Sequence, residues 1–392
     1  MKSTRLGLLL LALVACSRVT APNTVPSLQD VASSSTTALS SGYETLFDFD
    51  GTDGSKPVAG LITVNGLLYG TTSNGGTDGF GTVFSLSASG TESVLHSFAG
   101  PPKDGRSPNG LTAVHGTLYG TTLEGGKCGC GTLFEVSTAG KERTLYNFTA
   151  TGGSWFPNSA LIMVKNALYG TSNNSVYTAT TSGHAQTLHG FTGLYWPRAS
   201  LLAVSGVMYG TTGIGGANKY GTIYSITTAG NESVVYSFGD APDGRYPLAG
   251  LVDVDGTLYG TTESGGTGSC HGKKGPLGKA VVGCGTVFEI STSGAEKVLY
   301  SFRGNADGSR PEAGLLSVNG ALYGTTSMGG GHDGGTVFRF SRSGSESVLH
   351  SFGQGSDGAD PMAGLIDVNG TLYGTTASGG TDGDGTVFAM TP

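Results

Sequence analysis

Short apolar runs of strand length recur along the chain in sets of four. In the first set the runs cover residues 61–64, 67–72, 82–87 and 93–98. The first two runs are joined by Asn65-Gly66, a two-residue turn in which both positions tolerate positive φ. No long stretch places apolar residues at helical spacing, so the pattern predicts an almost entirely β protein. Each set is therefore expected to form a four-stranded antiparallel meander.

The most regular part of this pattern is Leu-Tyr-Gly-Thr-Thr or a close variant, followed by Gly-Gly and then Gly-Thr-Val-Phe. Its tyrosine occurs seven times, at Tyr69, Tyr119, Tyr169, Tyr209, Tyr259, Tyr323 and Tyr373. The steps between these tyrosines are 50, 50, 40, 50, 64 and 50 residues. A period near fifty indicates tandem repeats, each of which is one supersecondary unit.

The two ends of the repeat region indicate a closed ring. Residues 43–49 form a lone fourth strand before the first set, and residues 385–390 end the chain on a third strand. Pairing of the N-terminal strand with the last set would leave no open edge between the ends. The sequence therefore predicts a seven-bladed β-propeller over residues 43–392. An open β-solenoid is the alternative, but shorter repeats and no borrowed terminal strand would be expected there.

These elements resemble the GloVer tandem repeat of bacterial choice-of-anchor proteins, and the Gly-Gly pair after the second strand is also similar to kelch repeats. The matching elements are Gly-Leu before the first strand, Leu-Tyr-Gly-Thr-Thr, Gly-Gly and Gly-Thr-Val-Phe, which recur over about the whole repeat region. The resemblance implies a surface anchor that differs between members and no catalytic activity. The third set departs from it, since residues 171–177 contain neither Gly-Gly nor Gly-Thr.

The N-terminal residues are expected to direct export. Lys2 and Arg5 form a short basic region, and residues 6–14 form an apolar segment that is too short to span a bilayer. This arrangement indicates a signal peptide over residues 1–15.

The end of the signal resembles a bacterial lipobox, with Ala15 followed by Cys16. The resemblance implies cleavage before Cys16 and lipidation of that cysteine, which would anchor the protein in the membrane. Ordinary signal-peptidase cleavage with an incidental Cys16 is the alternative. Ser17 replaces the aspartate associated with inner-membrane retention, which favours the outer membrane. Residues 16–42 are rich in Ser, Thr, Ala and Pro and are predicted to be a tether.

Composition and charge exclude several functions. The chain has 70 glycines, 12% charged residues and a formal net charge of −7, with no cluster of Lys and Arg. Nucleic acid is therefore not an expected partner, and a monomer is expected. Nucleophile motifs, phosphate loops and metalloprotease helices are missing from the sequence, and spacing selects no pair of carboxylates. We therefore predict no catalytic residue, no cofactor and no metal site.

One face of the predicted propeller holds the variable connections, which run from second to third strands and from fourth strands to the next first strand. We call it the loop face, because binding residues concentrate in such loops on rigid scaffolds. Five of these loops contain Asp-Gly-x-x-Pro. The aspartates form either a ring of carboxylates for cations or sugars, or a set of Asx turns. They are Asp53, Asp104, Asp243, Asp307 and Asp357.

Two loops that lack this motif carry aromatic residues instead, including both tryptophans of the chain. The loop between them, at residues 171–176, is shortened and is expected to leave a recess. Aromatic platforms stack on sugar rings or anchor protein partners, whereas in the alternative these rings only fill the space left by the shortened loop. The candidate ligand-binding residues are Trp155, Phe156, Tyr195 and Trp196.

Rings and cysteines complete the candidates. One fourth-strand position holds either His or another ring, which indicates packing: His96, His189, His350, Tyr146, Tyr236, Tyr300 and Phe47. Export favours disulfides, and four cysteines allow three pairings. Cys270–Cys284 is preferred, and Cys128–Cys130 is possible but strained. A metal site at Cys270, His271 and Cys284 lacks a recognisable fourth ligand.

These features predict a lipid-anchored protein of the bacterial cell envelope that presents a non-enzymatic binding or interaction propeller, with a glycan or a protein as ligand. The competing class is a propeller hydrolase or lyase acting on polysaccharide, which would need two carboxylates close together in an axial pocket. A purely structural envelope protein is the third possibility, in which the four aromatic rings would be buried.

Overall fold

The computed structural model of the protein describes residues 42–150, 154–193, 195–270 and 282–392. The predicted signal peptide (1–15) and tether (16–42) lie outside the described residues, apart from Gly42, and both stay predictions. Within the described ranges, no helix has the length and apolar character needed to cross a membrane.

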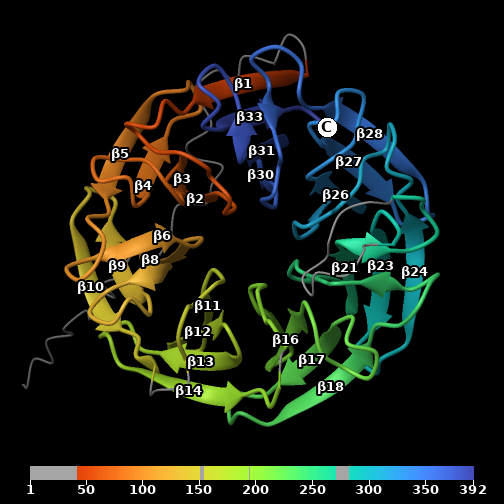
Figure 1. The fold of residues 1–392 in the computed structure, drawn as a ribbon, viewed down its shortest axis with the longest axis horizontal. Coiled ribbons are helices and arrows are strands. Elements are labelled where there is room, and N and C mark those ends of the chain that lie inside the picture. The colour runs from red at the N-terminus through yellow and green to blue at the C-terminus, as the bar shows by residue number, and fades with distance from the viewer. Residues whose placement is uncertain (1–41, 151–153, 194, 271–281) are drawn as a thin grey trace, which may run out of the picture. The chain divides into compact units, whose positions relative to one another are not determined.

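Seven sheets of four antiparallel strands follow one another around a central axis, so the predicted seven-bladed propeller is confirmed (Figure 1). Blade 1 contains β2 (Ile62–Val64), β3 (Leu67–Thr72), β4 (Thr82–Leu86) and β5 (Glu92–Ser97). Blade 2 contains β7 (Thr112–Val114), β8 (Thr117–Gly125), β9 (Thr132–Ser137) and β10 (Glu142–Asn147). Blade 3 contains β11 (Ile162–Val164), β12 (Ala167–Ser172), β13 (Ser175–Ala179) and β14 (Ala185–Gly190). Blade 4 contains β15 (Leu202–Val204), β16 (Val207–Thr212), β17 (Thr222–Ile226) and β18 (Glu232–Ser237).

The remaining blades have the same order. Blade 5 contains β20 (Val252–Val254), β21 (Thr257–Thr262), β23 (Thr286–Ser291) and β24 (Glu296–Ser301). Blade 6 contains β25 (Leu316–Val318), β26 (Ala321–Thr326), β27 (Thr336–Ser341) and β28 (Glu346–Ser351). Blade 7 contains β30 (Ile366–Val368), β31 (Thr371–Thr376), β33 (Thr386–Met390) and β1 (Tyr43–Asp48).

The ring closes between the two ends of the repeat region, as the sequence predicts. Strand β1 pairs antiparallel with β33, from Tyr43 opposite Met390 to Asp48 opposite Thr386. Figure 1 shows β1 on the rim, in line with the other fourth strands, while β2, β11 and β30 lie toward the axis. The N-terminal strand therefore supplies the fourth strand that the last repeat lacks.

Aromatic residues at the end of each fourth strand pack against the next blade. Each contacts a ring in the third strand of that blade, with centroids 5.0–5.3 Å apart and the rings edge-on or tilted. The third-strand ring also explains the glycine of Leu-Tyr-Gly. At Gly70 a Cβ atom would lie 2.5 Å from the Phe84 ring, so only glycine fits beside it.

The first threonine of the repeat motif joins neighbouring blades near the axis. Its hydroxyl donates a hydrogen bond to a backbone carbonyl of the following blade, and Thr375 closes the ring by donating to Pro57 O at 3.1 Å. The other six donors are Thr71, Thr121, Thr171, Thr211, Thr261 and Thr325. The signature that recurs in the sequence therefore builds the contacts between blades.

Candidate functional site

The variable connections meet on one face of the propeller, the loop face. Short strands formed by these connections pair with each other: β6 (Gly105–Pro108) with the end of β8, β19 (Gly244–Arg245) with β22 (Ser264–Gly265), and β29 (Gly358–Ala359) with β32 (Ser378–Gly379). In each pair the loop that enters a blade lies against the loop between that blade's second and third strands. Side chains from these loops are therefore held on an ordered frame.

One residue in each repeat has a left-handed backbone on this face. It directly precedes the proline that recurs in this loop of every repeat, and its φ lies between 52° and 59° in all seven repeats. In the fifth repeat, Tyr246 N donates to Tyr220 O at 2.8 Å, and Tyr246 O accepts from Glu263 N at 3.0 Å. This conformation costs a side-chain-bearing residue about 1–3 kcal/mol, and the flanking hydrogen bonds hold it in place. The seven pre-proline residues are Lys56, Ser107, Phe156, Trp196, Tyr246, Arg310 and Asp360.

The pre-proline residues differ in chemistry around the ring. Three consecutive blades present aromatic residues, Phe156, Trp196 and Tyr246, and the next two present Arg310 and Asp360. Two of the four aromatic residues selected from the sequence therefore occupy this structurally special position. The third member, Tyr246, is only 3% exposed, so its ring belongs to the interior.

The four predicted aromatic residues have different environments. Trp155 is 38% exposed, and its ring stacks on Phe156 at a centroid distance of 5.7 Å. Trp196 is half-buried, and the guanidinium of Arg198 lies 5.8 Å from its ring centroid. Tyr195 stacks on Phe191 at 5.2 Å and packs against the core of blades 3 and 4. Tyr195 therefore fills space, whereas Trp155 is available to a ligand.

The shortened loop of the third repeat supports the segment that carries Trp155. Asn173 N donates to Trp155 O at 3.2 Å, and Pro157 forms a bridge with Ser172. With its amide nitrogen facing Pro197 O, the side chain of Asn158 donates to that carbonyl at 2.9 Å. This hydrogen bond links the segments that carry Trp155 and Trp196, which lie 41 residues apart in the sequence.

A pocket of about 430 Å³ lies next to these segments. Each blade contributes the residue that directly follows its proline, so the lining surrounds the axis. The sequence patterns did not single out these residues, although their place after the proline would have located them. They are Val58, Asn109, Asn158, Arg198, Leu248, Glu312 and Met362.

Among the described residues that line this axial pocket, Glu312 is the single acidic one. Its carboxylate forms an ion pair with Arg310 Nη2 at 2.8 Å. The same nitrogen also forms an ion pair with Glu263, which is buried. Burial, reinforced by Glu263, raises the pKa of Glu312 although Arg310 and Arg198 oppose the shift. Two carboxylates therefore lie close together near the axis, with an arginine between them.

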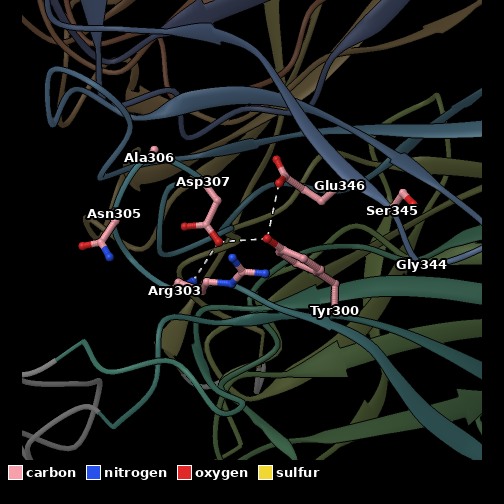
Figure 2. Close-up of a pocket in the computed structure, with 8 residues that line it drawn as sticks. All are labelled: Tyr300, Arg303, Asn305, Ala306, Asp307, Gly344, Ser345 and Glu346. Carbon is pink, nitrogen blue, oxygen red and sulfur yellow. Dashed lines mark hydrogen bonds between the residues drawn. The ribbon is translucent and has the colours of Figure 1, made fainter.

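The aspartates of Asp-Gly-x-x-Pro lie at the outer junctions between blades. Figure 2 shows the junction of blades 5 and 6, where Tyr300 OH donates to Asp307 Oδ2 at 2.9 Å. The same oxygen accepts from Arg303 N at 3.0 Å. At three further junctions the ring that bonds the aspartate is His96, Tyr236 or His350. These rings pack edge-on against the phenylalanine that ends their strand, as the sequence predicts, and they also bond to the aspartate of the turn.

A glutamate from the next blade approaches the aspartate at four of these junctions. Burial and the neighbouring aspartate raise the pKa of each glutamate, to about 6 for Glu346 and about 7 for Glu92, Glu142 and Glu296. In Figure 2, Tyr300 OH also contacts Glu346 Oε2 at 3.3 Å beside a cavity of about 460 Å³. The sequence did not reveal these pairs, because their members belong to different blades.

Two disulfides are present in the described residues. They join Cys128 to Cys130 and Cys270 to Cys284, which is the pairing considered from the sequence. The Cys270–Cys284 disulfide brackets the insertion in the fifth repeat. His271, considered above as a metal ligand, lies outside the described residues. Both disulfides lie in connections between second and third strands, on the loop face.

The sequence model described as the Gloeobacter/Verrucomicrobia repeat matches residues 90–274 and 277–392. A search of curated proteins finds no significant match.

Solved structures with a similar fold share little sequence. The computationally designed Ika8 protein has a TM-score of 0.52 and 14% identity, covering 88% of this chain and 100% of the designed chain. The WD40 domain of Neurospora crassa Pan2 has a TM-score of 0.55 and 9% identity, with 89% and 95% covered. PorZ, a surface component of the type-IX secretion system of Porphyromonas gingivalis, has a TM-score of 0.50 and 13% identity, with 84% and 46% covered. At such identities the similarity shows the fold alone.

Proposed function

The chain belongs to the Gloeobacter/Verrucomicrobia repeat family, and we propose that its propeller is a non-enzymatic binding module whose ligand site lies on the loop face at blades 3 and 4. The observation that carries this proposal is the exposed Trp155, stacked on Phe156, in a segment that leads into an axial pocket with mixed polar and apolar lining. The two segments that bear the tryptophans continue directly into residues that line that pocket. A ligand could therefore contact an aromatic surface and several hydrogen-bonding groups together.

This combination suits a glycan. Sugar rings stack on exposed aromatic faces through their C–H groups, and their hydroxyls need hydrogen-bond partners of both kinds. Arg198 and Asn158 supply donors in the pocket, and Glu312 supplies an acceptor. A protein ligand is the alternative within the same function, since exposed tryptophans also anchor protein partners.

A glycan array tests the proposal with the unmodified protein and the variants Trp155→Ala and Trp196→Ala. We expect the unmodified protein to bind, and each variant to lose at least tenfold in affinity. Val234→Ala is the matched control, because Val234 is 48% exposed on the outer strand β18 and away from the loop-face segments. Equal binding by all four proteins would exclude the aromatic site, and no glycan binding would favour a protein ligand.

A polysaccharide hydrolase or lyase is the second candidate, and the pair Glu263 and Glu312 favours it. Both carboxylates contact Arg310 Nη2, so they lie close together, as a glycosidase pair must. Glu263 is 2% exposed, however, and Arg310 offsets its charge, which suits a structural ion pair. Release of reducing ends from polysaccharides by the unmodified protein, and its loss in Glu312→Gln, would establish the enzyme.

We propose further that the propeller is exported and held at the cell envelope by a lipid on Cys16, with residues 16–42 as the tether. The two disulfides support export, because disulfides persist in oxidising compartments. Partitioning of the expressed protein into detergent tests the anchor. We expect the unmodified protein in the detergent phase and Cys16→Ala in the aqueous phase, and an equal distribution of both would contradict lipidation.

A further inference from the structure

The junction between blades 1 and 2 brings together three side chains that commonly bind metals. His96 lies on β5, Asp104 lies in the loop that follows, and Glu142 is the first residue of β10. One ligand atom from each of the three lies within 4.8 Å of the other two. Two blades therefore contribute to a single cluster.

The distance between the histidine and the aspartate suits a shared ion. His96 Nε2 and Asp104 Oδ2 are 3.0 Å apart, which the structure accommodates as a hydrogen bond. Two ligands bound at about 2.0–2.1 Å to a tetrahedral ion lie about 3.4 Å apart. A bound ion would therefore replace the proton between these atoms with only a small movement of the side chains.

Asp104 is held in position by the backbone. It is 8% exposed, and its carboxylate accepts hydrogen bonds from Ala99 N at 3.1 Å and from Gly105 N at 2.6 Å. Such outer hydrogen bonds fix the orientation of metal-ligating carboxylates.

The cluster also carries negative charge that a cation would compensate. Glu142 and Asp104 place two carboxylates in the same cluster, with ligand atoms within 4.8 Å of each other. His96 forms an ion pair with Asp104. Among the described residues, no Lys or Arg forms an ion pair with Asp104 or Glu142. A divalent ion would therefore compensate two carboxylates that, within the described ranges, have His96 as their basic partner.

Each of the equivalent junctions lacks at least one of the three ligand types. A tyrosine takes the place of the histidine where Tyr236 and Tyr300 bond their aspartates. At the junction of blades 6 and 7, the ring of Tyr43 stacks on His350 at a centroid distance of 3.7 Å. Within the described ranges, the complete set of His, Asp and Glu is found at the first junction.

We propose that His96, Asp104 and Glu142 bind one divalent transition-metal ion, with zinc as the best match, and that the ion links blades 1 and 2. Imidazole and carboxylate ligands suit Zn²⁺, and three protein ligands leave a position for water. The sequence predicted no metal site, because the three residues belong to two different repeats and show no recognisable spacing.

Metal titration of the chelator-treated, full-length chain tests the site. We expect one Zn²⁺ per chain by calorimetry, and Co²⁺ binding that is visible as an absorption band. His96→Tyr should weaken binding at least tenfold without unfolding the protein, because tyrosine occupies this position at Tyr146, Tyr236 and Tyr300. Glu142→Gln should weaken binding to a similar extent.

His189→Tyr is the matched control, because His189 holds the same strand position in blade 3 and the loop after it lacks the aspartate. Its affinity for Zn²⁺ should equal that of the unmodified protein. The proposal is overturned if no stoichiometric binding occurs, if His96→Tyr and His189→Tyr behave alike, or if Glu142→Gln leaves the affinity unchanged.

Discussion

Replacement of Glu346 by glutamine should stabilise the protein at neutral pH and have less effect in acid. Glu346 lies beside Asp307, and both carboxylates compete for the single hydroxyl hydrogen of Tyr300 (Figure 2). In the described part of the chain, Glu346 Oε1 and Asp307 Oδ1 also lack hydrogen-bond partners. A neutral amide at position 346 removes the second charge and can donate a hydrogen bond to this cluster.

The size of the effect follows from the pKa of Glu346. Burial and the charge of Asp307 raise this pKa from its usual 4.5 to about 6. A difference of about 1.5 corresponds to about 2 kcal/mol at 1.36 kcal/mol for each pKa unit. Glu346 is only half-buried, so solvent screening reduces the expected effect to about 1 kcal/mol.

The sign of the pH dependence is fixed by the raised pKa. Below pH 4.5 the carboxyl group is protonated in both the folded and the unfolded chain, and its stabilising contribution is fully present. Between pH 4.5 and 6 the unfolded chain loses its proton first, so the folded state loses stability. Above pH 6 the loss is complete. The advantage of Glu346→Gln should therefore grow by about 1 kcal/mol between pH 4 and pH 7.

Urea unfolding followed by tryptophan fluorescence at several pH values measures this difference. Glu232→Gln is the control, because Glu232 also begins a fourth strand but the loop before its blade lacks the aspartate. Its effect on the free energy of unfolding should not change in the same way. A pH-independent effect of Glu346→Gln, or a variant that is less stable than the unmodified protein at pH 7, would refute the reasoning.

Three further changes test how the blades are joined, each by the free energy of unfolding in urea. Gly285→Ala should destabilise the folded protein by about 3 kcal/mol or more, because φ is 101° there and a Cβ would overlap the proline of the next blade. Gly256 has open space around it, so the control Gly256→Ala should cost about 1 kcal/mol. Thr375→Val should cost about 1–2 kcal/mol, because it leaves Pro57 O without its hydroxyl donor. Tyr43→Ala should cost about 3–5 kcal/mol through lost packing at the ring closure. An effect of Gly285→Ala no larger than that of Gly256→Ala would contradict the role assigned to the glycine.

The closure of the ring could be predicted because it depends on counting. Each fourth strand ends in phenylalanine, and Phe49 stands before the first complete repeat while the last repeat ends at its third strand. Such a count requires no knowledge of side-chain contacts. The structure confirms the resulting pairing of β1 with β33.

The junction chemistry could not be predicted in the same way, because it depends on how one blade packs against the next. Tyr300 and Glu346 are 46 residues apart and occupy different positions of their repeats. Only the packing angle between blades 5 and 6 brings them together. The axial residues Arg198 and Glu312 were missed for a related reason, since the residue type after the proline varies among the repeats.

The third repeat differs from the others at its junction as well as in its loop. In the sequence, Gly153 takes the position that holds the aspartate in five repeats, and Ala185 takes the position of the glutamate. Next to Gly153, Ser154 Oγ lies 2.7 Å from Thr187 Oγ1 and 2.8 Å from Ser175 Oγ, so the polar contacts described here are between neutral hydroxyls. The segment that presents Trp155 therefore rests on a junction without the charge repulsion found beside Glu346.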